Sequence, residues 1–482
     1  MRKILLLTAM YIGMIFSANG QTSVWDGSHS TWTNGAGTQE SPYLIENAAQ
    51  LAHLAYIVNN GIGANNHTVG ANIYWKLMTD IDLNGSETFQ WTPIGYANSS
   101  TDYYSFGGTF DGNDHTVVNL YINTTALSLI GLFGWIDGAT IKNLGITGSS
   151  SVTGGSALLG AYAGGIAGYA SNTTINNCYN TGSVSSFDAG FDAGGIVGYA
   201  VNTAITDCNN TGSVAVSNDT SWMDCYSGGI VGLLSNSTIT DCKNTGSVSS
   251  YSFSSYSSSG GICGDASGFA GNIIVNRCYN TGSVSSDATD YSTSSGGIVG
   301  DAESTTVNNC YNIGTIYSDI DVYQGGIAGY SSGGAVNYSY YLVTCGGGNT
   351  YGGEVKTEEA MKDAGFVTLL NQGLATPAWK MDCTTPINNG FPVLLWQTCE
   401  GPDAVETIES QSINIYPNPA KDVITVASSE LQNANYTVFS ISGQALMYGK
   451  LQGETTTVNV STLPSGIYFI KAGNYAGRFV KQ

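Results

Sequence analysis

Three neighbouring side chains could carry out acid–base chemistry. His115 lies in the segment FDGNDHT beside Asp111 and Asp114, and an imidazole next to a carboxylate can accept and return a proton near neutral pH. Sugar-cleaving enzymes need paired carboxylates on one face, and lyases need a basic residue near the substrate. Few basic residues are available in the repeat body, namely Lys76, Lys142, Lys243 and Arg277. The segment is also typical of a structural strand, and we therefore predict no catalytic residue.

Two acidic spacings could supply oxygen ligands to Ca²⁺. Asp80 and Asp82, and likewise Asp319 and Asp321, are separated by one Ile. That alternation is more typical of a strand than of a coordinating loop. The sequence has neither an HExxH motif nor a CxxC pair, so a zinc site is not expected. We predict no metal and no cofactor.

The sequence has 10 cysteines, which divide into three groups. Five recur at one repeat position where an earlier copy has Leu144, and we interpret them as buried free thiols: Cys178, Cys208, Cys242, Cys278 and Cys310. Parallel side chains on adjacent coils suit a disulfide poorly. Cys383 and Cys399 flank a loop, and a disulfide is expected there in an exported protein. Cys225, Cys263 and Cys345 are left unassigned.

An internal repeat organises most of the chain. The pentapeptide GGIxG begins at Gly164, Gly194, Gly228, Gly260, Gly296 and Gly325. Nine residues after the Ile comes a β-branched residue, except in the fourth copy, where an insertion delays it to Val275. The Cys position and an NTGSV-like block follow. A degenerate copy begins at Gly131.

Each copy contains three short β-prone runs separated by turn residues. No copy can bury its apolar side alone, so the copies must stack and share one core. We predict an all-β, right-handed parallel β-helix with three strands per turn. The Asn of the NTGSV block should form a stacked amide ladder at the bend.

The repeats resemble the GLUG motif family over roughly Ile130 to Leu342. That resemblance implies an extracellular scaffold of the kind present in large bacterial surface proteins, adhesins and some immunoglobulin-A metallopeptidases. It implies little about chemistry, and the metallopeptidase HExxH motif is missing here.

Capping modules are predicted at both ends of the solenoid. We expect a module over 21–125, with a helix from Ile45 to Asn59 and strands beginning at Tyr74, Trp91 and Phe106. Repeats fill 126–345. A second cap over 346–400 should contain a helix from Thr357 to about Asn371 and a final strand from Asn388 to Trp396. A linker, 401–411, follows.

The N-terminal end and the composition indicate export. Residues 1–20 read as a signal peptide, with Arg2 and Lys3 before an apolar run and small residues before Gln21. No segment is long enough to be a transmembrane helix. The net charge of −21 argues against nucleic acid and anionic membranes as partners.

The last segment, 412–482, differs from the body in being balanced in charge and in alternating with period two. It carries INIYPNPAKDVITV from Ile413, an SGQ turn and LPSGIYF, and predicts a small antiparallel β-sandwich. These motifs resemble the type A C-terminal sorting domain of type IX secretion in Bacteroidetes. The resemblance implies recognition by that secretion machinery, removal of the domain, and attachment to lipopolysaccharide or release.

The favoured function is a secreted, surface-displayed, adhesin-like protein without catalytic activity that binds an unknown extracellular protein or glycan. The expected contact surface is the variable Ser-, Tyr- and Asp-rich segments beginning at Ser186, Ser217 and Tyr251, including Trp222. The alternative is a polysaccharide-degrading β-helix enzyme, either a lyase or a glycoside hydrolase.

Overall fold

The computed structural model describes residues 25–99, 101–155, 161–187, 192–219, 223–253, 255–267, 273–289, 292–318, 323–347, 351–399, 411–412, 414–427, 434–440, 445–453, 455–472 and 475–482. The predicted signal peptide and almost all of the predicted linker lie outside them. The chain forms two compact units, Met1–Gln397 and Thr398–Gln482, which are described separately.

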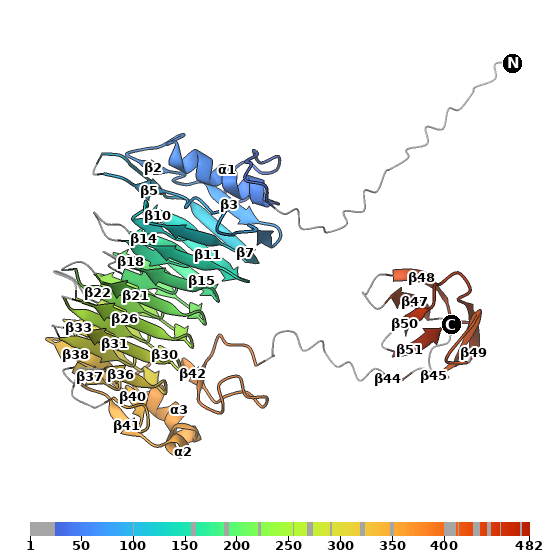
Figure 1. Ribbon diagram of the computed structural model, residues 1–482. Coiled ribbons are helices and arrows are strands. Elements are labelled where there is room, and N and C mark those ends of the chain that lie inside the picture. Colours follow the sequence, from blue (N-terminus) through green and yellow to red (C-terminus); the bar gives the residue numbers. More distant parts are fainter. Residues whose placement is uncertain are drawn as a thin grey trace. The chain divides into compact units, whose positions relative to one another are not determined.

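The first unit is a parallel β-solenoid of about nine turns (Figure 1). Four parallel sheets run along it. They are called sheets 1 to 4 here, in the order in which the chain of one GGIxG repeat passes through them. Sheet 1 contains β9 (Leu129–Ile130), β13 (Tyr162–Gly164), β17 (Asp192–Gly194), β22 (Cys225–Gly228), β27 (Ser257–Gly260), β32 (Thr293–Gly296) and β37 (Tyr323–Gly325). Sheet 2 contains β2 (Thr68–Val69), β6 (Tyr103–Phe106), β10 (Phe133–Asp137), β14 (Ala167–Ser171), β18 (Val197–Val201), β23 (Val231–Ser235), β28 (Cys263–Asp265), β33 (Val299–Glu303) and β38 (Ala328–Ser332), with β5 (Tyr96–Ala97) antiparallel to β6.

Sheet 3 carries the Ile/Val and Cys positions of the repeat. It contains β1 (Tyr43–Ile45), β3 (Tyr74–Leu77), β4 (Ile81–Asp82), β7 (Thr109–Val118), β11 (Thr140–Thr147), β15 (Thr174–Asn180), β19 (Ala204–Thr206), β20 (Asn209–Asn210), β24 (Thr238–Thr240), β25 (Lys243–Asn244), β29 (Ile273–Asn276), β30 (Tyr279–Asn280), β34 (Thr305–Asn308), β35 (Tyr311–Asn312), β39 (Ala335–Asn337), β40 (Tyr340–Leu342) and β41 (Glu354–Lys356). Sheet 4 contains β8 (Tyr121–Thr124), β12 (Ser151–Gly154), β16 (Ser183–Ser186), β21 (Val214–Asn218), β26 (Val248–Ser252), β31 (Val284–Ala288) and β36 (Ile316–Ser318).

The prediction of three strands per turn is wrong, because the run around GGIxG is two strands meeting at a corner. The backbone turns at the second Gly and the Ile, so that β13 ends at Gly164 and β14 begins at Ala167. A Cβ on Gly165 would lie 2.6 Å from the carbonyl oxygen of Gly195 and 2.8 Å from the amide carbon of Asn180. Glycine is therefore required where the corner of one coil packs against the next.

The predicted core is confirmed. The Ile of every GGIxG copy is fully buried, as are the five recurring cysteines, and these cysteines are free thiols. Cys225, Cys263 and Cys345 are also buried, and they are thiols and not half of a disulfide. Registered pairing, such as Ile175 with Ile205, stacks identical side chains in successive coils.

The predicted amide ladder is confirmed at the bend between sheets 3 and 4. The Asn180 amide donates to Asn210 Oδ1, Asn210 to Asn244, Asn244 to Asn280 and Asn280 to Asn312, each at 2.9 Å. Each Nδ2 also donates to the carbonyl oxygen two residues on, for example that of Gly246 at 2.8 Å. The buried polar column is thereby satisfied.

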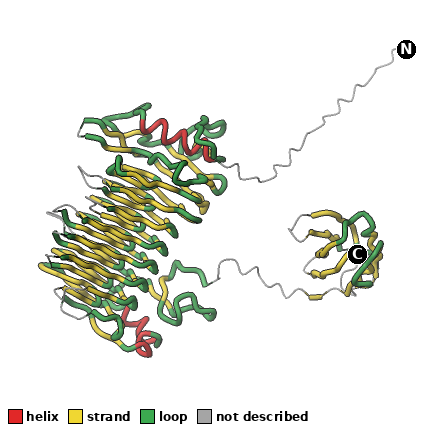
Figure 2. The backbone as a smooth tube through the Cα atoms, in the orientation of Figure 1, coloured by secondary structure: helices red, strands yellow, loops and turns green. Residues whose placement is uncertain are grey.

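Helices occur only at the two ends of the described solenoid (Figure 2). The first helix, α1 (Ala48–Asn59), is shorter than predicted because Asn47 caps it, accepting from the Gln50 backbone N–H, while Ile45 ends β1. The stretch from Trp91 forms no strand. It makes only an isolated bridge from Ile94 to Phe133.

The second cap contains two short helices instead of the single one predicted. Thr357 caps α2 (Glu358–Met361) as expected, but Asp363 starts a new helix, α3 (Ala364–Leu370). The predicted final strand is reduced to β43 (Val393–Leu394), antiparallel to β42 (Trp379–Lys380). Cys383 and Cys399 are disulfide-bonded, as predicted.

The second unit has two sheets that share one apolar core, in agreement with the predicted sandwich. One contains β44 (Gln411–Ser412), β51 (Tyr475–Lys481), β50 (Gly466–Ala472), β47 (Asn435–Ser440) and β48 (Ala445–Lys450). The other contains β45 (Asn414–Tyr416), β46 (Val423–Ala427) and β49 (Thr455–Asn459). Among all described residues, no helix has the length and apolar character needed to cross a membrane.

Candidate ligand groove

Two columns of side chains on the outside of the solenoid border the corner between sheets 1 and 2. The first column stands two residues before each GGIxG: Tyr162, Asp192, Tyr226, Ser258, Ser294 and Tyr323. The second stands directly after the pentapeptide: Tyr169, Tyr199, Leu233, Asp265, Asp301 and Tyr330. In-register pairing of the coils aligns both columns along the solenoid.

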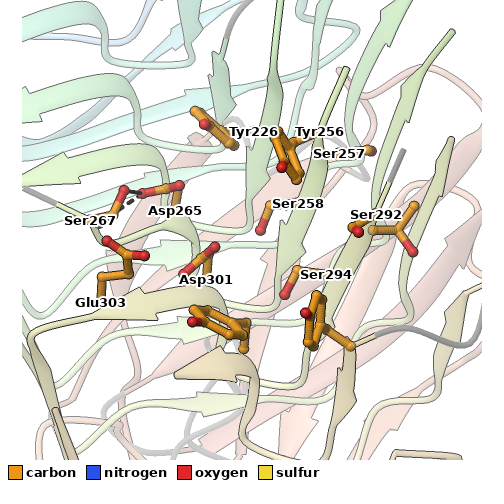
Figure 3. A pocket seen from close by; sticks show the side chains of 13 residues that line it. Tyr226, Tyr256, Ser257, Ser258, Asp265, Ser267, Ser292, Ser294, Asp301 and Glu303 are labelled. Atoms are coloured by element: carbon orange, nitrogen blue, oxygen red, sulfur yellow. Dashed lines mark hydrogen bonds between the residues drawn. The ribbon is translucent and has the colours of Figure 1, made fainter. Parts of the chain in front are cut away.

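A groove opens where both columns change residue type. Ser258 and Ser294 replace larger side chains in two successive coils, and Asp265 and Asp301 stand opposite them (Figure 3). The serine hydroxyls donate back to the corner, to the carbonyl oxygens of Gly264 at 2.8 Å and Gly300 at 2.6 Å. The cavity measures about 380 Å³, and its other principal lining residues are Tyr226, Tyr256, Glu303, Tyr323 and Tyr330.

Asp265 and Asp301 of this groove are poorly solvated, and neither is paired with a cation among the described residues. Asp265 is 3% exposed and accepts hydrogen bonds from the Ser267 backbone N–H, at 2.7 Å, and from its hydroxyl. Burial raises the Asp265 pKa to about 6. Burial, followed by repulsion from Asp265 and Glu303, raises the Asp301 pKa to about 8. Asp301 Oδ1 is buried without a hydrogen-bond partner among the described residues.

A further acid lies one coil before the groove. Asp192 is 1% exposed, and neither of its carboxylate oxygens has a hydrogen-bond partner in the described part of the chain. Burial, then repulsion from Asp265 and Asp224, raises its pKa well above the ordinary value. Neighbouring Tyr226 donates its hydroxyl proton to Asp224 at 3.0 Å. The acidic side chains of this face therefore extend beyond the cavity.

Aromatic clusters flank the groove on both sides. At one end of it, the lining residues Tyr323 and Tyr330 meet edge to face with ring centroids 5.0 Å apart, and Tyr351 lies 5.2 Å from Tyr330. Before it, the rings of Tyr169 and Tyr199 are 5.2 Å apart. Carboxylates accept hydrogen bonds, while tyrosine faces can stack on sugar rings or hold cations. Both properties suit ligand binding.

The predicted acid–base residues do not form a comparable site. His115 Nδ1 lies 3.3 Å from Asp80 Oδ1, whereas Asp111 pairs with Lys142 at 3.3 Å and accepts from Asn143 Nδ2 at 2.9 Å. Asp114, within β7, has a left-handed backbone conformation with φ of 62°. All of these partners lie on or beside sheet 3, away from the corner of sheets 1 and 2.

The predicted contact segments and calcium spacings have mixed outcomes. In the segment from Tyr251, Phe253 and Tyr256 are 47% and 54% exposed, and Tyr256 lines the groove. Trp222 and most of the segment from Ser186 lie outside the described residues. Asp82 belongs to β4, as the alternation predicted, while Asp319 and Asp321 are likewise outside the description.

Sequence reasoning missed Asp265 and Asp301, although a signal was present. The residue after GGIxG is aromatic or aliphatic in most copies, but it is Asp in the fourth and fifth. In the same two copies the residue two positions before GG changes to Ser. These coincident changes become informative once the two positions are known to face each other across a corner.

Comparisons with known protein families identify both parts of the chain. Residues 414–482 match the model described as the secretion system C-terminal sorting domain. Residues 160–185, 189–215 and 224–249 match the GLUG motif. The sorting domain, of the type IX system, supports secretion and display at the cell surface through interaction with that machinery.

Curated relatives match only in part. Halomucin of Haloquadratum walsbyi is 34% identical over 157 residues, which is 31% of this chain and 2% of that protein. A protein of Evansella cellulosilytica, provisionally described as a Gly-rich membrane protein, is 34% identical over 158 residues, 32% of this chain and 16% of that one. The chain therefore spans a small fraction of the relatives that it matches.

A solved structure shares the fold. A Bacteroides ovatus protein, provisionally described as an immunoglobulin A1 protease, aligns with 76% of this chain and 96% of its own length. The TM-score is 0.52 and the sequence identity 21%. This level of likeness concerns the fold alone.

Proposed function

We propose that this protein is a surface-displayed, adhesin-like solenoid that binds an extracellular macromolecule in the groove between sheets 1 and 2. The groove carries the proposal, because it combines carboxylates, serine hydroxyls and tyrosine rings in one concave site. The variable segments between sheets 4 and 1 border it through Tyr256 and contribute contact area. Export through the sorting domain supports a ligand outside the cell.

The proposal is tested by comparing binding of the full-length chain with binding of groove variants. Tyr323→Ala and Tyr330→Ala should weaken binding to a glycan array, to immobilised extracellular-matrix proteins or to intact cells. Tyr448→Ala removes a tyrosine that is 88% exposed in the sorting domain and serves as the matched control. Unchanged binding of both groove variants to every bound surface would exclude the groove as the binding site.

Hydrolysis of a polysaccharide is a second candidate, and one observation favours it. Asp265 and Asp301 are paired in register on adjacent coils, and their pKa values of about 6 and about 8 leave one ionised and one protonated near pH 7. A retaining glycosidase uses such a pair as nucleophile and acid. Release of reducing ends that is lost in Asp265→Asn and Asp301→Asn would establish this activity. Incubation with immunoglobulin A1 tests proteolysis in parallel.

A further inference from the structure

We propose that the groove receives a cationic side chain, lysine or arginine, from an extended segment of a basic protein ligand. The inference rests on the proposed function, in which this groove is the binding site. It adds the chemical class of the partner and the residues that recognise its charge.

The first argument is an unbalanced charge. Asp265, Asp301 and Glu303 line the cavity, and no described residue lining it is basic. Asp301 Oδ1 lacks a hydrogen-bond partner among the described residues, and so do both oxygens of Asp192, which is 1% exposed in the adjoining coil. Buried carboxylates without partners are unfavourable, and a cation supplied by a ligand would remove that penalty.

The second argument is the shape and chemistry of the walls. Tyr226 stands in the coil before the two serines, and Tyr323 and Tyr330 stand in the coil after them. Tyrosine faces attract a cation through the ring quadrupole, and they pack against the methylenes of a long side chain. Because Ser258 and Ser294 donate their protons to the backbone, their hydroxyl oxygens remain available as acceptors. An ammonium or guanidinium group donates only, and therefore complements these walls.

The third argument concerns which macromolecule fits. The protein has 35 acidic and 14 basic residues, so its field repels anionic polymers and attracts basic ones. A basic protein segment carries fixed cations at neutral pH, whereas a neutral glycan would leave the groove charge uncompensated. A divalent ion is disfavoured as the occupant, since no three acidic, His or Cys side chains of the described residues are arranged to hold a metal.

Cation binding should be linked to protonation of the groove. Asp265 faces the site from β28, Asp301 and Glu303 from β33, and Tyr226, Tyr323 and Tyr330 from β22, β37 and β38. Asp224 lies beside Tyr226 and adds negative potential, whereas burial raises the pKa of the neighbouring Asp192 and keeps that carboxyl protonated. A bound cation favours the ionised carboxylates, so the affinity should rise as the pH increases from 5.5 to 8 and protons leave Asp265 and then Asp301.

The experiment uses the full-length chain and three fluorescent peptides measured by anisotropy. The first is Gly-Lys-Gly-Lys-Gly, the second has both lysine amines acetylated, and the third has arginine in place of lysine. At pH 7.5 we expect the cationic peptides to bind about tenfold more tightly than the acetylated one, as a partly desolvated charge pair would give. The better of the two cationic peptides identifies the preferred side chain.

Asp301→Asn and Asp265→Asn should each remove most of that preference. Asp287→Asn, on sheet 4, deletes the same charge outside the groove and should leave the preference unchanged. Equal affinity for the free and acetylated peptides, absence of binding by any peptide, or an equal effect of Asp287→Asn would overturn the inference. The effect of Tyr323→Ala and Tyr330→Ala on binding to immobilised proteins and cells separately decides whether the groove is the ligand site.

Discussion

Replacing Asn244 by Asp should destabilise the solenoid strongly although it barely changes side-chain volume. Asn244 is fully buried; its amide donates to the Gly246 carbonyl oxygen at 2.8 Å and to Asn280 Oδ1 at 2.9 Å. Its own Oδ1 accepts from Asn210 Nδ2 at 2.9 Å and from the Gly246 N–H at 3.2 Å. An ionised Asp can still accept hydrogen bonds from Asn210 and Gly246. Its second oxygen, however, replaces the Nδ2 group and has no proton to donate to the Gly246 carbonyl oxygen or to Asn280 Oδ1.

The magnitude follows from these two lost donations. Each of the two buried acceptors that loses its donor costs about 1–3 kcal/mol, so a loss of about 2–6 kcal/mol is expected. The free energy of unfolding is measured by urea titration at pH 8, followed by circular dichroism.

Asn202→Asp is the matched control for this prediction. Asn202 belongs to a parallel but exposed amide row, donating to Asn172 Oδ1 at 3.2 Å and accepting from Asn236. Water replaces the lost donor there, and Asp tolerates the left-handed backbone, so the cost should stay below about 1 kcal/mol. If both variants unfold at the same urea concentration, the buried ladder does not stabilise the coils as argued.

Four further predictions address the core, the thiols, the groove and export. Ile196→Asp buries a carboxylate without a partner at a cost of several kcal/mol, and wild-type thermal stability in this variant would refute the inward assignment. Thiol labelling after unfolding without reductant should modify the eight cysteines that are not in the disulfide and spare the disulfide, whereas four or fewer labelled thiols would contradict the unpaired column. Because the folded-state pKa of Asp301 is raised to about 8, wild-type stability should fall as the pH rises from about 4 to 8. Asp301→Asn should flatten that slope and be the more stable protein at pH 8, and parallel pH profiles would argue against a raised pKa. Deleting 412–482 should leave a folded body inside the cell envelope, and normal surface levels of the truncated chain would disprove the sorting role.

Residue spacing predicted the periodic features because registered stacking repeats one environment many times. The buried Ile196 and the amide of Asn244 each have equivalents in neighbouring coils. The same residue types therefore recur at the same positions of the repeat, where the sequence pattern makes them visible. The corner at Gly165 was harder to foresee, since two short strands and one bent strand have the same local composition. The caps were predicted less accurately because Asn47 and Asp363 each start a helix through a single capping contact.

The groove was not predicted because it arises between positions that are separated in sequence and joined only by the corner. Ser258 and Asp265 belong to different strands, and each is unremarkable by itself. His115 attracted attention because of its residue type, yet its neighbours Asp80, Asp111 and Lys142 form local pairs on sheet 3. Residue type indicates potential chemistry, whereas burial without a partner, as at Asp301, distinguishes a candidate site.

The corner between sheets 1 and 2 makes ligand specificity evolvable one coil at a time. Each coil contributes one side chain to either column, and neither column contributes to the Ile core beneath. Exchanging Tyr226 for Ser and Leu233 for Asp would lengthen the groove by about 4.8 Å, the spacing of adjacent strands, with no change in the buried residues. Related chains could thus bind longer or shorter charged segments through changes at the two column positions of each coil. The buried core and the sorting domain would stay the same.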